Sequence, residues 1–266
     1  MGEVIVVTSG KGGVGKTTTT ANLGMSLALL GHRIALVDAD IGLRNLDIVL
    51  GLENRIVYDV VDVVEGFCRL KQALIKDKRL DGLCLLPAAQ TRDKSAVSPD
   101  QMRGVCADLA RDHDYVLVDS PAGIEQGFRS AAAGARRAVI VTTPEVMAVR
   151  DADRIIGLLE AMGIREPELV VNRIRPAMVR RGDMMDIEDI IDILAIELLG
   201  VVPEDDVMLV SGNRGEPAAL NGSSRAGEAF RNIARRLRGE SVPLYELERT
   251  RGVLGRIRRL VGVERS

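Results

Sequence analysis

The strongest chemical signal in the sequence is a glycine-rich segment near its start. The run Gly10-Lys11-Gly12-Gly13-Val14-Gly15-Lys16-Thr17 fits the pattern G-x-x-x-x-G-K-[ST] at every fixed position, between an apolar run and a helical pattern. In such a loop the backbone N–H groups surround phosphate oxygens, and the following helix adds its positive end. We therefore predict a nucleotide site made by Gly12, Gly13, Val14, Gly15, Lys16, Thr17 and Thr18.

Two side chains of this segment have specific tasks in the predicted site. Lys16 is placed to reach the β- and γ-phosphates, and the Thr17 hydroxyl is placed to bind Mg²⁺. The alternative is an ordinary glycine-rich turn between a strand and a helix. The complete pattern in this context favours nucleotide binding over that alternative.

Carboxylates follow two further apolar runs. Asp38 and Asp40 stand at the end of the run 34–38, at the edge where ligands bind in open α/β sheets. Asp119 ends the run 115–119, as in a Walker B strand whose carboxylate faces Mg²⁺ directly or through water. Aspartates after a strand also serve as simple turn formers, so for Asp38 and Asp40 spacing alone leaves both interpretations open.

The elements that must position these residues follow from the hydrophobic pattern. Short β-branched runs alternate with longer segments of 3.6-residue period, which is typical of α/β proteins with a mostly parallel sheet flanked by helices on both faces. The predicted strands are Val4–Thr8, Ile34–Asp38, Leu83–Leu86, Tyr115–Asp119, Ala138–Val141, Leu169–Asn172 and Leu199–Val202. The predicted helices are Thr17–Leu30, Val60–Glu65, Pro99–Ala110, Ala148–Met162, Ile187–Ile196 and Arg225–Arg238. The expected fold is therefore that of a P-loop NTPase.

Composition excludes several classes of function. Six aromatic residues are too few for the stacking platforms of single-strand-binding domains, and two histidines exclude a multi-histidine metal site. The three cysteines, Cys68, Cys84 and Cys106, are far apart and are expected to be small buried hydrophobes in a reducing cytoplasm. The chain opens almost directly on an apolar strand, so no signal peptide is expected.

Charge is distributed unevenly along the chain. Residues 249–266 contain six arginines and one glutamate, a net charge of +5, so the other 248 residues carry −7 of the total of −2. A body of that charge offers little to nucleic acid, whereas an anionic membrane surface could attract the tail. We predict a P-loop domain over residues 1–240, a linker over 241–250, and an amphipathic membrane-targeting helix over 251–266.

The predicted tail helix has an apolar side and a basic side. At about 100° per residue its aliphatic side chains fall within an arc of about 120°, and the arginines lie at the edges of that arc or opposite it. A terminal helix docked on its own domain, or disordered basic residues, are the alternatives. The proposed membrane residues are Val253, Leu254, Ile257, Leu260 and Val261 with Arg256, Arg258 and Arg259.

The extra lysine at position 11 is the feature by which the chain resembles the deviant-Walker, or ParA/MinD, family of dimeric ATPases. Further blocks resemble its MinD branch, and they span residues 1 to about 217. They are Asp40-Ile41-Gly42-Leu43-Arg44-Asn45-Leu46-Asp47, Asp119-Ser120-Pro121-Ala122-Gly123-Ile124-Glu125, Asn172-Arg173-Ile174-Arg175-Pro176, Gly182-Asp183-Met184-Met185 and Pro203-Glu204-Asp205. The tail differs from the usual MinD tail, because it has aliphatic residues and arginines in place of Phe and Lys.

The resemblance implies ATP and Mg²⁺ as cofactors and assigns roles to individual residues. Lys11 crosses the dimer interface to the partner's nucleotide, Lys16 binds phosphate, and Asp40 orients or activates the attacking water. Mg²⁺ is held by Thr17, Asp40 and Asp119, while Asp38 supports the phosphate-loop region. The adenine is framed by Asn172, Arg173, Pro203 and Asp205.

The resemblance also implies a function. A MinD-type ATPase dimerises with ATP, binds the membrane, places the division septum and is released by hydrolysis; its partners are a MinC-like division inhibitor and a MinE-like or other topological activator. Partner contacts are expected at Arg150, Asp151 and Asp153. The expected location is the cytoplasm, with peripheral binding to the inner face of the cell membrane in the ATP state.

Two other functions stay open at the level of sequence. A ParA-like ATPase that positions DNA or cargo would need a basic stripe on its body, and no nucleic-acid partner is expected. A non-catalytic, nucleotide-gated scaffold would lack a residue that positions water, and Asp40 argues against it.

Overall fold

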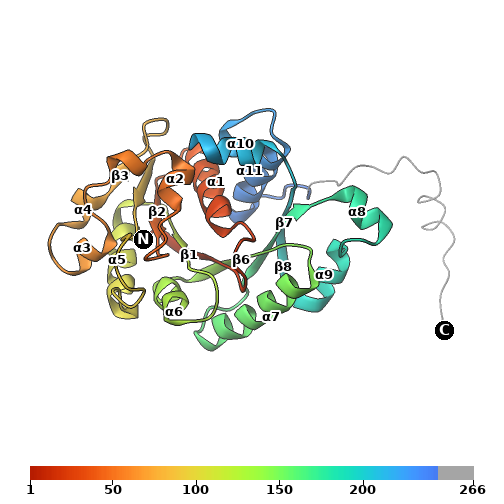
Figure 1. The fold of residues 1–266 in the computed structure, drawn as a ribbon, viewed down its shortest axis with the longest axis horizontal. Helices are drawn as coiled ribbons and strands as arrows, with labels where there is room; N and C mark the ends of the chain where they lie inside the picture. Colours follow the sequence, from red (N-terminus) through yellow and green to blue (C-terminus); the bar gives the residue numbers. More distant parts are fainter. Residues whose placement is uncertain (245–266) are drawn as a thin grey trace.

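The computed structural model describes residues 1–244, in which one sheet runs through the centre of the molecule (Figure 1). The strands lie in the order β3-β4-β2-β5-β1-β6-β7-β8, and every pairing is parallel except that of β3 with β4. The strands are β1 Glu3–Thr8, β2 Ile34–Asp38, β3 Ile75–Lys76, β4 Leu83–Leu86, β5 Tyr115–Asp119, β6 Arg137–Thr142, β7 Glu168–Ile174 and β8 Glu197–Pro203. The predicted fold class, a mostly parallel α/β sheet with helices on both faces, is confirmed.

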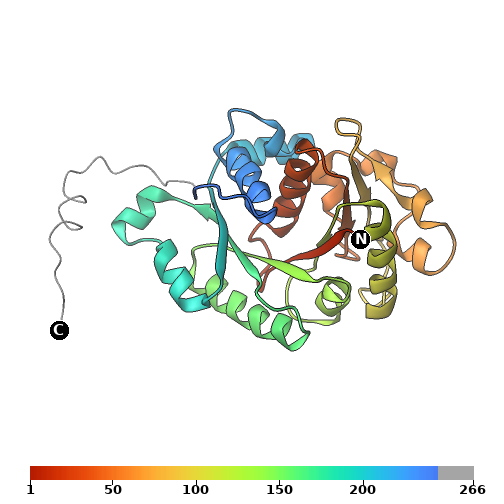
Figure 2. The same ribbon diagram turned by 180° about the vertical axis from the view of Figure 1, so that it is seen from behind.

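Helices cover both faces of the sheet (Figures 1 and 2). The helices are α1 Lys16–Leu29, α2 Leu46–Leu50, α3 Val60–Val64, α4 Leu70–Ala73, α5 Pro99–Asp112, α6 Gln126–Ala132, α7 Val146–Ala161, α8 Pro176–Arg181, α9 Ile187–Leu194, α10 Val207–Arg214 and α11 Arg225–Leu237. Short 3₁₀ turns lie at Glu53–Arg55 and Ala218–Leu220. All the predicted strands and helices are present, and none of their ends differs from the prediction by more than two residues.

Several elements were not predicted because they are too short to show a period. Strand β3 has 2 residues, α4 has 4 and α2 has 5. The longer helices carry clear boundary signals. Ser98 accepts from the Gln101 N–H in a capping box with Pro99 in the first turn, and Ser224 accepts from the Gly227 N–H at the start of α11.

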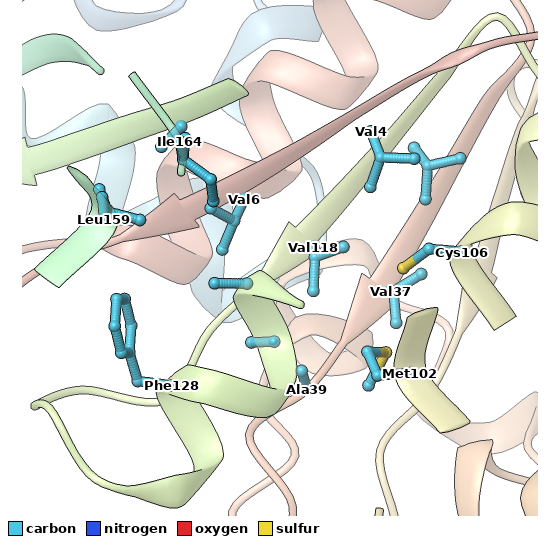
Figure 3. Close-up of a cluster of buried hydrophobic side chains, with 14 of the residues drawn as sticks. Val4, Val6, Val37, Ala39, Met102, Cys106, Val118, Phe128, Leu159 and Ile164 are labelled. Carbon is cyan, nitrogen blue, oxygen red and sulfur yellow. The ribbon is translucent and has the colours of Figure 1, made fainter. Parts of the chain in front are cut away.

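The core is divided by the sheet into two layers, as alternation along β1 requires. Val4 and Val6 pack with α3, α5, α6, α7 and α9 on one face, while Ile5 and Val7 pack with α1, α2 and α11 on the other. Figure 3 shows the first of these layers, with Phe128 of α6 below the strands. Burial on both faces explains why the central strands are continuous apolar runs.

The cysteine prediction is partly wrong. Cys84 and Cys106 are buried as expected, but Cys68 is only partly buried, because it lies at the rim of the core beside α3 and α4. All three are free thiols. Within residues 1–244, no helix is both long enough and apolar enough to cross a bilayer.

Candidate nucleotide site

The phosphate loop joins β1 to α1 at the carboxyl edge of the sheet. Its backbone needs glycine at two crowded points. A Cβ on Gly10 would lie 2.2 Å from the Asp151 carbonyl oxygen of α7, and one on Gly15, whose φ is +97°, would lie 2.3 Å from Asn172 Nδ2. The loop is therefore pressed between α7 and the end of β7, and only residues without a side chain fit there.

Helix α1 begins at Lys16, and in the described part of the chain its first turn has no side-chain cap. The N–H groups of its first turn thus remain for another acceptor, which is the arrangement that binds phosphate at P-loop helices. Lys16 is itself buried, and burial lowers the pKa of its ammonium, while the nearby charges of Asp119 and Asp40 oppose that shift. Lys16 therefore lies close to two carboxylates, those of Asp119 and Asp40.

Asp38 and Asp119 lie side by side, because β2 and β5 are neighbours and these residues are in register. Burial, followed by the negative charge of Asp119, raises the pKa of Asp38 to about 8. Burial raises the pKa of Asp119 to about 6, although hydrogen bonds from Thr17 and Thr20 and the charge of Lys16 lower it. Two crowded buried carboxylates favour a positive charge between or beside them.

The structure gives Asp38 a more specific task than the predicted support of the phosphate-loop region. Its carboxylate accepts from the Asp40 N–H at 3.0 Å and from the Leu46 N–H at 3.1 Å. It thus fixes both ends of the loop that follows β2 and carries Asp40. Support of the phosphate-loop region by Asp38 stays a prediction beside this observed role.

Asp40 has a carboxylate oxygen that is able to accept a further hydrogen bond or to bind a cation. Its Oδ1 atom is buried and has no hydrogen-bond partner among residues 1–244. Burial raises the pKa of Asp40, and the positive charges of Lys94 and Lys16 oppose this shift. Lys94 was not predicted, because it lies on the loop after β4 and only the sheet order places that loop beside the end of β2.

Lys11 lies at the outer side of the site. Its Nζ is 3.3 Å from Glu145 Oε2, and the two side chains are 45% and 60% exposed. Glu145 stands directly before α7 and was not predicted as a site residue. The reach of Lys11 across a dimer interface stays a prediction, and within one chain its ammonium is paired with Glu145.

The four residues expected around the base come from the neighbouring ends of β7 and β8, and their contact with adenine stays a prediction. Asn172 donates from Nδ2 to the Val14 carbonyl at 2.8 Å and accepts from the Arg173 N–H at 2.9 Å, so it lies against the phosphate loop. Arg173 lines a cavity of about 890 Å³ at the ends of β6, β7 and β8. Pro203 is the last residue of β8.

Asp205 has a structural role in this arrangement. Its carboxylate accepts from the Val207 N–H at 3.0 Å, from Ser224 Oγ at 2.8 Å and from the Ala226 N–H at 3.1 Å. Asp205 therefore ties the starts of α10 and α11 to the end of β8. A contact of Asp205 with adenine stays a prediction.

The residues present fit a nucleotide with Mg²⁺. Among residues 1–244, no three His, Cys, Asp or Glu side chains are close enough to hold a metal by themselves. A cation here would thus need ligands of other kinds, which the Thr17 hydroxyl and phosphate oxygens supply. The orphaned Oδ1 of Asp40 and the hydrogen-bonded Asp119 are the carboxylates available to such a cation.

Arg150, Asp151 and Asp153 lie on the first turns of α7, beside the phosphate loop. Arg150 and Asp153 are exposed, while Asp151 contacts Gly10 through its backbone and pairs with Arg154 at 3.7 Å. The first turns of α7 are thus in direct contact with the phosphate loop, although partner binding by these residues stays a prediction. The membrane residues predicted between 253 and 261 lie outside the described residues.

The fold and the loop together define a P-loop NTPase with a mostly parallel sheet. The family model for the CobQ/CobB/MinD/ParA nucleotide binding domain matches residues 5–218. The septum site-determining protein MinD of Bacillus subtilis (strain 168) is 59% identical over 266 residues, which cover 99% of each chain. The chain therefore belongs to the MinD/ParA family, and the resemblance to the MinD branch is confirmed.

Two solved structures agree with this assignment. The MinC:MinD cell division protein complex of Aquifex aeolicus contains a chain with a TM-score of 0.85 and 52% identity, covering 92% of this chain and 98% of that one. MinD of Pyrococcus horikoshii, complexed with Mg-ADP, has a TM-score of 0.82 and 30% identity over 89% of this chain and 96% of that one.

Proposed function

We propose that this protein is a MinD-type ATPase that dimerises with ATP, binds an anionic membrane surface through its C-terminal tail and helps to place the division septum. The observation that carries the proposal is the convergence of Lys16, Asp40 and Asp119 on the phosphate loop, with a buried Asp40 oxygen that has no hydrogen-bond partner among residues 1–244. The identity of 59% to a septum site-determining protein supports the cellular role.

The chemistry follows from the positions of the side chains. Lys16 and the first-turn N–H groups of α1 bind the phosphates, and Thr17, Asp40 and Asp119 would hold Mg²⁺, which neutralises charge on the phosphate oxygens. Asp40 orients the attacking water and accepts its proton, because its free carboxylate oxygen faces no other donor in the described chain. Lys94 and Lys16 favour the ionised carboxylate that this task needs.

The position of Lys11 supports the proposed dimerisation. This lysine lies at the rim of the site and is paired with the exposed Glu145. In the proposed dimer it leaves Glu145 and contacts the nucleotide of the other protomer. A surface ion pair of this kind is worth about 0–1 kcal/mol, so a phosphate that carries several charges can outcompete it.

Partners are proposed from the relatives and from charge. The Aquifex aeolicus structure is a MinC:MinD complex, and we propose a MinC-like inhibitor as a partner here. A MinE-like or other topological activator would trigger hydrolysis and release. The protein would be cytoplasmic, and peripheral on the inner face of the cell membrane in its ATP state.

Vesicle sedimentation is the experiment that tests the proposed function. The protein is mixed with vesicles of phosphatidylglycerol and phosphatidylcholine in the presence of ATP, ADP or no nucleotide, and phosphate release is measured in parallel. The proposal requires sedimentation with ATP well above that with ADP. Equal sedimentation in all three conditions contradicts it, and salt-sensitive retention on DNA would favour a ParA-like role.

A further inference from the structure

The end of α11 reverses the direction of the chain by a defined turn. Gly239 has a φ of +85° and donates from its N–H to the Arg236 carbonyl at 2.7 Å, and the Glu240 N–H donates to the Arg235 carbonyl at 3.1 Å. Arg235 and Arg238 both pair with the Glu240 carboxylate, at 2.8 Å and 3.1 Å. We call the segment 239–244 the tail root. These contacts fix the direction in which it leaves α11.

Arg236 binds the tail root to the sheet. Its Nε donates to the Val242 carbonyl at 3.0 Å, its Nη2 to the Pro243 carbonyl at 2.9 Å, and its Nη1 to the Leu199 carbonyl of β8 at 2.6 Å. Among residues 1–244 it forms no ion pair with a carboxylate, and burial lowers the pKa of its guanidinium. A partly buried arginine that serves only backbone carbonyls is a fixed structural connector, since the planar fork holds three acceptors at once.

The surface of β8 is shaped to receive this arginine. β8 is the last strand in the sheet order, and its pairing with β7 skips Leu199, which is the extra residue of a β-bulge. A Cβ on the next residue, Gly200, would lie 2.4 Å from Ile233 Cγ1 and 2.9 Å from Arg236 Nη1. The bulge frees a carbonyl and the glycine gives room for the guanidinium.

The tail root lies near the amino ends of the strands, whereas the nucleotide site lies at their carboxyl ends. α11 begins beside Asp205, at the carboxyl ends of the strands, and ends beside Arg137, at the start of β6, whose Nη1 donates to the Leu237 carbonyl at 3.2 Å. If two protomers meet through their nucleotide edges, the two tail roots stand at the far ends of the dimer. The direction in which each root points then decides whether both tails reach one flat surface.

We propose that Arg236 is a positioning residue for membrane binding, which anchors the root of the C-terminal tail to β8 and directs both tails of a dimer to the same anionic lipid surface. The inference rests on the proposed function, since it takes the tail as the membrane anchor. In this proposal the folded domain contributes to the avidity of the dimer, because it holds the two tails in directions that let both bind one membrane surface. The residues that carry it are Arg236, Leu199, Gly200, Val242 and Pro243.

The expected size of the effect follows from tether length. Loss of the anchor frees about five more residues per tail, and effective concentration falls roughly as the −3/2 power of tether length. Length alone then weakens vesicle binding of the dimer about twofold, and the loss of direction adds to this. We expect a total weakening of about two- to fivefold, with no change for a protein that engages one tail only.

The test compares three variants of the full-length chain. Arg236→Gln removes the anchor, Arg236→Lys keeps the charge but cannot bind three carbonyls as a fork, and Arg238→Gln is the control. Arg238 lies on the same turn and contacts Glu240 but neither Val242 nor Pro243, so its loss changes the charge equally. Binding to phosphatidylglycerol–phosphatidylcholine vesicles is titrated with ATP, and again for each variant combined with Lys11→Ala, which is expected to be monomeric.

A spin label at position 244 reports on the anchor directly. Leu244→Cys is labelled in a Cys68→Ser background, where the remaining cysteines are buried. We expect a less mobile label in the otherwise unchanged chain and in Arg238→Gln than in both Arg236 variants. Equal label mobility in all proteins would overturn the anchor.

The two proposals fail in different ways. If the chain with Arg236 does not bind vesicles with ATP, the proposed function fails. If it binds but both Arg236 variants bind as tightly with ATP, the positioning role fails while the proposed function stands. Weakening of the Lys11→Ala monomer to the same extent would also overturn the inference, because it would show an effect on single-tail affinity.

Discussion

The buried carboxyl groups of Asp38 and Asp119 should make the free energy of unfolding of the nucleotide-free protein depend on pH. Their pKa values in the folded state, about 8 and about 6, lie above the ordinary value of 3.8, so the folded state binds more protons than the unfolded state between these limits. The stabilisation is complete near pH 4 and is lost as pH rises toward 8. We expect the free energy of unfolding in urea, without nucleotide, to fall over this range from these two groups.

Replacement of Asp38 isolates this contribution. Asp38→Asn should show a flatter dependence of the urea midpoint on pH, because one of the two coupled carboxylates is gone. Asp100→Asn, at an exposed position of α5, serves as the control and should keep the slope of the original chain. An unchanged slope in Asp38→Asn would show that this carboxyl group does not hold a proton in the folded state.

Asp40 should govern turnover rather than binding. Asp40→Ala is expected to bind ATP and dimerise but to lose phosphate release by about 10²-fold or more, because the group that positions and deprotonates water is gone. Lys16→Ala should fail earlier, at nucleotide binding, which equilibrium dialysis with labelled ATP would show. Wild-type turnover by Asp40→Ala would remove Asp40 from the mechanism.

Variants of Lys11 and Glu145 distinguish the two contacts proposed for Lys11. One is the ion pair with Glu145 of the same chain, and the other is the contact with the nucleotide of the other protomer. Lys11→Ala should bind ATP and remain monomeric in light scattering. Glu145→Gln should still dimerise, at an ATP concentration unchanged or lowered a few-fold, because an exposed ion pair contributes little. A normal ATP-dependent dimer of Lys11→Ala contradicts its role across the interface.

At the scale of elements, the close packing of α11 on β8 depends on Gly200. A methyl group there overlaps Ile233 and Arg236, so Gly200→Ala should lower the free energy of unfolding by about 1–3 kcal/mol. Gly157→Ala is a matched control in α7, where no atom of the described residues lies within 4 Å of the added Cβ. It should be neutral or stabilising by up to about 1 kcal/mol, because alanine favours the helix. Equal stability of both variants in urea would show that β8 and α11 can separate at no cost.

At the scale of the whole molecule, the tail should make ATP a switch for membrane binding. Gly252, Gly255 and Gly262 each disfavour a helix by about 1 kcal/mol, so a single tail should bind only weakly. Two tails on one dimer gain on the order of 10²–10⁴ in avidity. Truncation after Thr250, or Ile257→Glu, should abolish vesicle binding and leave ATP-dependent dimerisation intact, and raised salt should weaken the full-length chain. Equal vesicle binding with ATP and ADP would refute avidity as the mechanism.

The phosphate loop, the long helices and the central strands could be predicted from the sequence alone. Each of these is contiguous, and its pattern follows from local backbone geometry or from burial on both sides, so neighbouring residues carry the whole signal. The base pocket and the role of Lys11 came from resemblance alone. Asp40 was found because it follows a strand, but its availability for chemistry is shown only by the burial of its Oδ1 atom and the lack of a hydrogen-bond partner for that atom among residues 1–244.

Contacts between segments that are distant in the sequence are seen only in the folded protein. The order of the sheet places Asp38 beside Asp119 and brings Lys94 close enough to act on Asp40, and no local pattern encodes which strands become neighbours. The contact of Lys11 with Glu145 and the anchoring of Val242 by Arg236 depend likewise on side chains that meet only after folding. Long-range contacts of this kind have no period along the chain, because they arise from the packing of complete elements on one sheet.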